Sequence, residues 1–223
     1  MFGNFYHLAI AIGFLVSLIL LKDKKGKELI AHKVIAFTLF LVLIMELAGS
    51  YTASKSINNS LLYNIGWVYI ESFLLIYYFN LLEFNEKFKR SIFYISLGLL
   101  ALGLINSLFF QSLTQVFQFY SFLPFALLII VLAVRFLTNL MNLRVYADYN
   151  LVLLPHFWIC WAILLFYIEA ILLFGAYQFR PVLVLDNVHL LFTINKLVAG
   201  LMYLVFGLAF MLPWIYKKKL VIE

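Results

Sequence analysis

Long apolar stretches, separated by short polar segments, recur along the whole chain. Seven of them come close to or exceed about 20 residues, the length that a helix needs to cross the hydrocarbon core of a bilayer. They cover residues 3–21, 34–53, 61–82, 91–110, 116–137, 151–176 and 188–215. The pattern predicts an all-α integral membrane protein, a bundle of seven transmembrane helices that forms a single domain over residues 1–223.

The composition requires lipid as the solvent for much of the chain. Hydrophobic residues make up 66% of the 223 positions and charged residues only 12%, with a mean hydropathy of +1.05. A soluble domain has about a quarter charged residues, so this chain could not cover its apolar core with polar surface. We therefore expect a lipid bilayer around it and no nucleic-acid partner, although the net charge is +6.

Lysine and arginine residues are distributed unequally between the two ends of the predicted helices. The loops at one end hold only Lys55 and Arg180, and Lys196 lies within a predicted span. The segments at the other end hold thirteen of the sixteen: Lys22, Lys24, Lys25, Lys27, Lys33, Lys87, Lys89, Arg90, Arg135, Arg144, Lys217, Lys218 and Lys219. Cytoplasmic loops carry the excess of Lys and Arg, so we expect the N-terminus outside and the C-terminus in the cytoplasm. The abundance of Phe, Ile, Asn and Lys suggests a bacterial inner (cytoplasmic) membrane.

Four ionisable residues lie well inside predicted spans, namely Glu46, Glu71, Glu169 and Lys196. Each would cost at least about 2.5 kcal/mol if it faced lipid, so such side chains normally point into the bundle or a water-filled cavity. At a rise of about 1.5 Å per residue, all four lie roughly 11 to 15 Å below the outer ends of their helices. This common depth predicts one outward-facing, buried, charged site.

Helical periodicity adds further residues to this site. Residues at alternating steps of three and four share a helix face, and on the last span these are His189, Thr193, Lys196, Gly200, Tyr203 and Gly207. On the third span, Trp67 shares a face with Glu71. The predicted ligand-binding set is therefore Glu46, Trp67, Glu71, Glu169, His189, Thr193, Lys196 and Tyr203.

Two interpretations of the buried charges stay open at this level. The charges can form an ion-pair network that only fixes the register of the helices, since a buried salt bridge is sometimes a specificity device. Alternatively, they line a functional cavity, because three carboxylates face one ammonium and the surplus acids must be protonated or bound to something.

No motif in the sequence indicates catalysis. The patterns HExxH, GxSxG, GxGxxG and the P-loop do not occur. The spacing of His, Cys, Asp and Glu does not predict a metal site either. We therefore expect neither enzyme activity nor a bound metal.

Two short segments resemble microbial rhodopsins, a family of seven-helix proteins with an outside N-terminus. One is the Tyr-Ile-Glu segment at 69–71, and the other is the Asn-Lys pair at 195–196, followed by Gly200. The resemblance implies that Lys196 would hold retinal as a Schiff base, with Glu71 as its counter-ion. The arginine, the second acid and the Trp-x-x-Tyr-Pro motif that are usual in the family are absent.

The leading functional hypothesis is a small receptor- or sensor-like membrane protein. Its charged site would bind a small ligand or protons from outside, and its short basic loops would pass the change in helix packing to a cytoplasmic or membrane protein partner. Three alternatives stay open: an ion- or proton-coupled transporter, a retinal-binding photoreceptor or pump, and a structural subunit of a membrane complex. A cofactor, retinal on Lys196, is implied only by the rhodopsin resemblance.

Overall fold

The structure is a computed structural model that describes residues 2–23, 26–141 and 151–215. Its α-helices are α1 (Phe2–Leu20), α2 (Gly26–Ser54), α3 (Ser60–Tyr63), α4 (Ser72–Leu82), α5 (Glu86–Phe109), α6 (Phe119–Met141), α8 (Pro155–Phe179), α9 (Pro181–Asp186) and α10 (Val188–Leu208). Short 3-10 turns follow at η1 (Leu21–Asp23), η3 (Leu151–Leu153) and η4 (Ala209–Met211), and η2 (Asn64–Glu71) is a π-helix. The described ranges contain no strand, so the predicted all-α class is confirmed for them.

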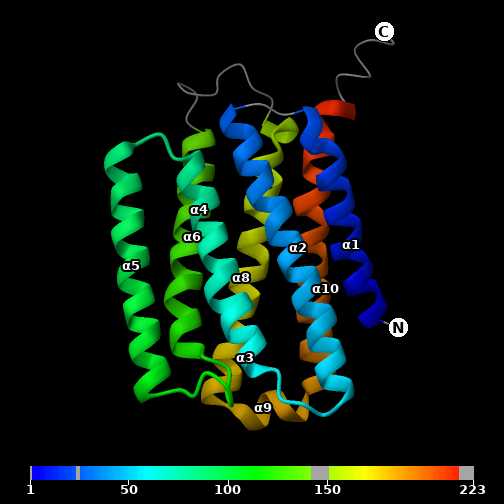
Figure 1. Cartoon of the computed structure of the whole chain (residues 1–223), viewed down its shortest axis with the longest axis vertical. Helices are drawn as coiled ribbons and strands as arrows, with labels where there is room; N and C mark the ends of the chain where they lie inside the picture. Colours follow the sequence, from blue (N-terminus) through cyan, green and yellow to red (C-terminus); the bar gives the residue numbers. More distant parts are fainter. Residues whose placement is uncertain (1, 24–25, 142–150, 216–223) are drawn as a thin grey trace.

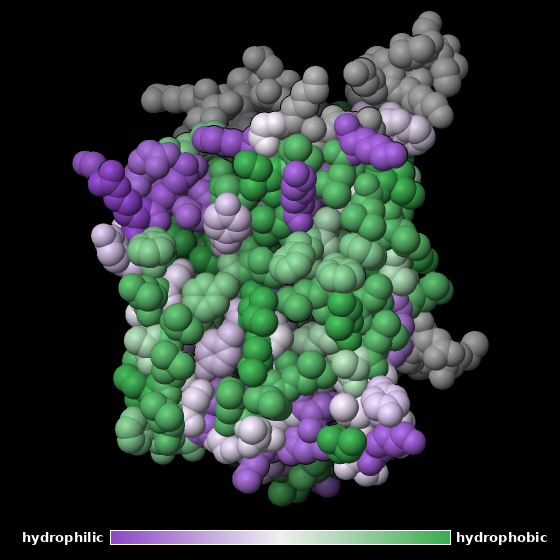
Figure 2. Space-filling model, viewed as in Figure 1, coloured by the Kyte–Doolittle hydropathy of each residue, from purple (hydrophilic) through white to green (hydrophobic). Residues whose placement is uncertain are grey.

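Within the residues that the structure describes, six helical stretches are long and apolar enough to cross a membrane. They are Gly26–Ser54, Ser60–Leu82, Glu86–Phe109, Phe119–Met141, Pro155–Phe179 and Val188–Ile215. The α1 helix is also apolar, but its apolar part, Phe5–Leu20, is shorter. On the face that Figure 2 shows, apolar residues form a broad belt across the middle of the bundle, and hydrophilic residues gather toward its two ends. This distribution fits a bilayer, whose hydrocarbon core lies between two polar interfaces.

The helices run side by side, and the short helix α9 lies across one end (Figure 1). The α8 helix packs against both α6 and α10, and α1 packs against α10 and α2. The α5 helix has its main contacts with α6 and α4, and it is the least buried of the six long stretches. The core therefore lies between α2, α4, α6, α8 and α10, with α5 at the edge of the bundle.

Local sequence sets several helix boundaries. The side chain of Asn85 accepts hydrogen bonds from the backbone N–H groups of Lys87 and Phe88, which caps the start of α5. Pro155 and Pro181 occupy the first turns of α8 and α9, where the missing N–H would have no helical partner anyway. These residues fix where the chain turns at the ends of the bundle.

The α1 and α10 helices cross in close contact at two glycines. A Cβ atom on Gly207 would overlap the backbone of Gly13, and a Cβ atom on Gly13 would lie 2.5 Å from the carbonyl oxygen of Tyr203. Small residues allow the backbones of membrane helices to approach each other in this way. The contact holds the Tyr203 turn of α10 against α1.

The third predicted span is helical but not a continuous α-helix. The elements α3, η2 and α4 follow one another over Ser60–Leu82, and the middle eight residues, Asn64–Glu71, wind as a π-helix. Such turns are rare and are frequently found at functional sites. The hydrophobic pattern predicts a plain helix here, because a change from i→i+4 to i→i+5 hydrogen bonding leaves no clear trace in apolar periodicity.

The basic residues gather at one end of the bundle, which we call the basic end. Its described members are Lys22, Lys27, Lys33, Lys87, Lys89, Arg90 and Arg135. Lys55 follows α2 and Arg180 precedes α9, both at the opposite end (Figure 1). The remaining positions of the predicted basic set, and the N-terminal residue, lie outside the described residues: Met1, Lys24, Lys25, Arg144, Lys217, Lys218 and Lys219.

Candidate functional site

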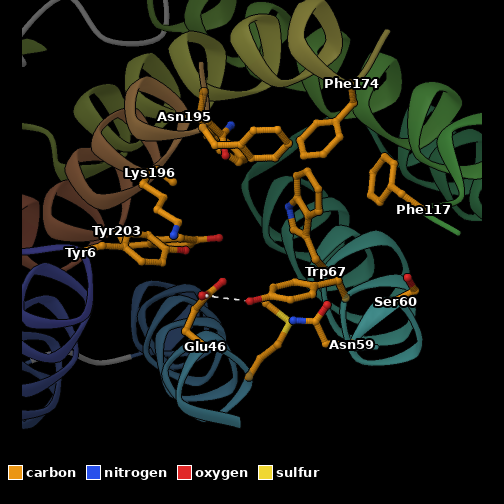
Figure 3. A pocket seen from close by; sticks show the side chains of 15 residues that line it. Tyr6, Glu46, Asn59, Ser60, Trp67, Phe117, Phe174, Asn195, Lys196 and Tyr203 are labelled. Atoms are coloured by element: carbon orange, nitrogen blue, oxygen red, sulfur yellow. Dashed lines mark hydrogen bonds between the residues drawn. The ribbon is translucent and has the colours of Figure 1, made fainter. Parts of the chain in front are cut away.

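A cavity of about 320 Å³ opens between α1, α2, the α3–η2 stretch, α8 and α10 (Figure 3). It is lined by Tyr6, Met45, Glu46, Asn59, Ser60, Tyr63, Trp67, Phe117, Phe166, Phe174, Phe192, Asn195, Lys196, Ala199 and Tyr203. Asn59 and Ser60 belong to the turn between α2 and α3. The cavity therefore reaches the end of the bundle opposite to the basic end. Its volume is at the lower limit of small-molecule sites, which begin at about 300 Å³.

One side of the cavity, which we call the polar end, is formed by Tyr6, Glu46, Tyr63, Lys196 and Tyr203. The hydroxyl of Tyr63 donates a hydrogen bond to Oε2 of Glu46 at 3.1 Å. The hydroxyl of Tyr6 also interacts with this carboxyl group. Lys196 extends into the same space (Figure 3), close enough for its ammonium to interact electrostatically with Glu46. Side chains from four separate segments of the chain thus meet at one point.

Lys196 has no direct acidic partner in the described part of the chain. No carboxylate oxygen there lies within 4.0 Å of its Nζ atom. The side chain is exposed although the surrounding α10 helix is strongly apolar. A lysine ammonium is a compact, strongly hydrated charge. At this position it needs water or an anion from outside the chain as its hydrogen-bond partner.

Glu71 lies behind the cavity wall and is fully buried. The hydroxyl of Tyr203 donates to both of its carboxyl oxygens, at 2.9 Å to Oε1 and 3.2 Å to Oε2. Buried polar groups in folded proteins are almost always hydrogen-bonded, and Tyr203 meets this need for Glu71. Because Tyr203 also lines the cavity, one side chain connects the cavity to this buried acid.

Glu169 has an equivalent connection on the α8 side. The side-chain amide of Asn195 donates to its Oε2 atom at 2.8 Å. Asn195 lines the cavity, whereas the half-buried Glu169 does not. The predicted acids are therefore held by neutral donors rather than by Lys196.

The other side of the cavity, which we call the aromatic end, is formed by Trp67, Phe117, Phe166, Phe174 and Phe192. The ring centroids of Trp67 and Phe174 are 5.2 Å apart, and those of Phe117 and Phe174 are 4.4 Å apart. Phe192 meets Phe174 edge to face at 6.2 Å. Aromatic rings at such distances attract each other through dispersion and their quadrupoles. This end offers a flat apolar surface to a ligand.

The structure brings together part of the predicted ligand-binding set. Four members of the set line the cavity: Glu46, Trp67, Lys196 and Tyr203. Glu71 and Glu169 do not line it, but each accepts a hydrogen bond from a wall residue.

His189 and Thr193 do not belong to the wall of the cavity; His189 is exposed and Thr193 is half-buried. The α10 residues in the wall are Phe192, Asn195, Lys196, Ala199 and Tyr203. Of the predicted stripe, Lys196 and Tyr203 line the cavity, whereas Gly200 and Gly207 face α1. Periodicity alone does not tell which of two adjacent faces a neighbouring helix covers.

Sequence reasoning missed several wall residues, among them Tyr6, Tyr63 and Phe174. The chain has 24 Phe and 14 Tyr, so a single aromatic position carries little information about a site. A polar residue in an apolar helix is a stronger signal. By that criterion Asn195, which stands beside Lys196, could have been included.

A buried polar network holds the 110–118 loop, and sequence reasoning did not predict it. The side-chain amide of Asn64 donates to the carbonyl oxygens of Leu113 and Val116, at 2.8 Å each. Further hydrogen bonds join Tyr69, Asn106, Ser107, Gln111, Gln118 and Ser121. By fixing this loop, the network positions Phe117 at the aromatic end.

At the basic end, Glu83 and Arg135 form an ion pair. Nε of Arg135 donates to Oε2 of Glu83 at 2.6 Å, and the guanidinium lies 3.7 Å from the ring centroid of Phe88. Burial alone would raise the pKa of Glu83, but the hydrogen bonds from Arg135 and from the backbone N–H groups of Asn85 and Phe84 bring it below its ordinary value. The pair ties the end of α4 to α6.

Comparisons of the chain with protein-family models, with curated proteins and with solved structures find no match. The resemblance to microbial rhodopsins stays a prediction. In the structure, Lys196 lines the cavity and Glu71 lies behind Tyr203. Within the described residues, no three His, Cys, Asp or Glu side chains are grouped to hold a metal ion.

Proposed function

We propose that this chain is a seven-helix membrane receptor or sensor whose cavity binds a small ligand from the side opposite to the cytoplasm. The observation that carries the proposal is a cavity with a polar end and an aromatic end that reaches the bundle end remote from the basic residues. Concave sites with apolar walls and a few convergent polar groups are the usual form of small-molecule sites. Under this proposal the basic end is cytoplasmic, the N-terminus is outside, and the membrane is a bacterial inner membrane.

The proposal also includes a route from the cavity to the basic end. Tyr63 and Trp67 of the wall belong to the stretch α3–η2, which continues into α4 and ends beside the Glu83–Arg135 pair. A π-helix contains an extra residue per turn, so a change between π and α winding is a discrete step that would rotate α4. Switching proteins use such discrete rearrangements of packed elements. Occupation of the cavity would thereby be transmitted to a cytoplasmic or membrane partner.

Ligand binding is tested with indole, a neutral planar molecule suited to the aromatic end. Isothermal titration calorimetry on the protein in detergent micelles, with empty micelles as blank, is expected to show saturable binding. Trp67→Ala should weaken it by about tenfold, as expected for loss of one aromatic contact. Trp161→Ala is the matched control, because Trp161 is 53% exposed on α8 and does not line the cavity. Absent binding, or equal effects of the two substitutions, would refute the cavity as a ligand site.

Transmission is tested by hydrogen exchange at residues 83–88. Indole is expected to change the exchange rates of these amides in the wild-type protein. Glu71→Gln keeps the size of the buried side chain but alters its bond to Tyr203, so it should retain indole binding and lose most of the change at the basic end. An undiminished change in this variant would show that the signal does not pass through Glu71.

An ion- or proton-coupled transporter is a second candidate, favoured by one observation. The π-helical interruption lies within a span and beside acidic residues, as the irregular helices of many transporters do. Liposomes that contain the protein and a pH-sensitive dye distinguish the two functions. Proton flux that Glu71→Gln abolishes would support the transporter function. The absence of flux would support the sensor function instead.

A further inference from the structure

The cavity separates polar from apolar wall residues, and this restricts the shape of any ligand. The aromatic end is built from stacked and edge-on rings, with Trp67 and Phe174 at its centre. The polar end faces it across the cavity (Figure 3). A molecule that fills both ends must have a flat apolar body and one polar group, because an apolar group against Lys196 would leave the charge of its ammonium unsolvated.

The charges at the polar end indicate the sign of that polar group. The carboxyl groups nearest to the cavity already receive hydrogen bonds from neutral donors: Glu46 from Tyr63, and Glu71 from Tyr203. Among the described residues of the cavity wall, Lys196 is the one Lys or Arg, and no described carboxylate lies within 4.0 Å of its ammonium. Lys196 interacts with Glu46 only at a longer distance, and an anion in the cavity would give its ammonium a close partner.

We propose that the ligand of this cavity is a small organic monoanion, with a planar apolar body at the aromatic end and a carboxylate on Lys196. This inference rests on the proposed function, since it names the ligand class of the same site. A carboxylate beside the ammonium can also accept hydrogen bonds from the tyrosine hydroxyls of the polar end. A dianion is less suited, because Lys196 is the one Lys or Arg among the described residues of the wall and its single positive charge can balance only one negative charge.

Three indole compounds with the same body and different charges test the proposal. Indole-3-acetate is negative at pH 7, indole is neutral and tryptamine is positive. We expect calorimetry at low salt to show that indole-3-acetate binds roughly tenfold to a hundredfold more tightly than indole, the effect of one hydrogen bond to a charged group. Tryptamine should bind more weakly than indole.

Lys196→Met is expected to remove this preference, so that indole-3-acetate binds no more tightly than indole, because methionine keeps the apolar length of the side chain without its charge. Lys55→Met is the matched control, since Lys55 is an exposed lysine at the same end of the bundle outside the cavity, and it should keep the preference.

The inference is overturned if tryptamine binds more tightly than indole-3-acetate, if both charged compounds bind as tightly as indole, or if the preference survives Lys196→Met. In each of these cases indole still binds, and the proposed function stands. If indole does not bind to the wild-type protein, the proposed function itself fails.

Discussion

At the scale of single residues, the main feature is how the buried carboxyl groups are accommodated. Glu46, Glu71 and Glu169 each accept a hydrogen bond from a tyrosine hydroxyl or an asparagine amide. None of them forms a close ion pair with Lys196. Of the two sequence interpretations, a close ion-pair network is therefore not formed among these four residues. The acids still depend on their neutral donors, and this dependence can be measured.

Tyr203→Phe is expected to destabilise the protein. It removes the donor to both oxygens of the fully buried Glu71, and an unsatisfied buried polar group costs about 1 to 3 kcal/mol. The free energy of unfolding in mixed detergent micelles measures the effect. Tyr51→Phe is the control, because Tyr51 is 65% exposed on α2 and should change stability by less than about 0.5 kcal/mol. Equal stability of the two variants would contradict this account of Glu71.

Glu83→Gln is expected to reduce stability in a pH-dependent way. The folded pKa of Glu83 is lowered, so the ion pair with Arg135 stabilises the fold above the unfolded pKa of about 4.3. This stabilisation is lost as the pH falls through the lowered folded value. The difference between wild type and variant should be about 1 kcal/mol at pH 6 to 7, a figure reduced for solvent screening, and should shrink below about pH 4. Thermal unfolding at several pH values measures it, and Glu86→Gln serves as control, because the side chain of Glu86, which pairs with Lys89, is 74% exposed. A difference that does not vary with pH would exclude the ion pair as its cause.

At the scale of elements, two helices have features that position the cavity. The α10 helix approaches α1 through the Gly13–Gly207 contact, which sets Tyr203 and Lys196 against Tyr6. The η2 π-helix changes the winding of the third span between Asn64 and Glu71. Asn64 thereby meets the 110–118 loop, and Glu71 meets Tyr203. The cavity depends on these local departures from ordinary helix packing.

Gly207→Ala is expected to destabilise the bundle. The new Cβ would overlap the Gly13 backbone, which cannot move without shifting α1, and overpacking of this kind costs about 1 to 3 kcal/mol. Gly98→Ala in α5 is the matched control, because no atom lies within 4 Å of its new Cβ, and it should be neutral or stabilise by up to about 1 kcal/mol. Melting temperatures in detergent report both. Similar melting temperatures for the two variants would mean that α1 and α10 are not in close contact.

At the scale of the whole molecule, the basic residues and the cavity lie at opposite ends of an apolar bundle. The described members of the basic set surround the η1 turn, the α4–α5 connection and the end of α6. The cavity reaches the α2–α3 turn at the other end. This polarity supports the proposed orientation, in which an external ligand and a cytoplasmic output use different ends of the bundle.

The orientation can be tested with single cysteines in a Cys160→Ala background, since Cys160 is the one cysteine of the chain. An impermeant maleimide should label Lys55→Cys and Asp186→Cys in intact cells. Lys27→Cys and Lys87→Cys, which are exposed at the basic end, should react only after lysis. The reverse pattern would place the basic end outside and invert the proposed topology.

The order of residues along the chain is enough to predict the helical class, the approximate bounds of the long apolar helices and the unequal charge of the two ends. These properties depend on which residues follow one another, because hydrophobic length and loop charge are properties of continuous segments. Sequence reasoning also found the ionisable residues of the site, since a charge within an apolar span stands out regardless of its partner.

Which side chains meet cannot be predicted in this way and is known from the folded structure. The rotation of α10 toward the cavity is set by the glycine contact with α1, and the place of Phe117 is set by hydrogen bonds from Asn64 across nearly fifty positions of sequence. The donor to Glu46 is Tyr63, which a pattern rich in tyrosine does not single out. Periodicity included Tyr203 in the predicted site, but it did not show that its hydroxyl donates to Glu71. Contacts of this kind depend on how several helices rotate and pack at once, and no periodicity within one helix contains that information.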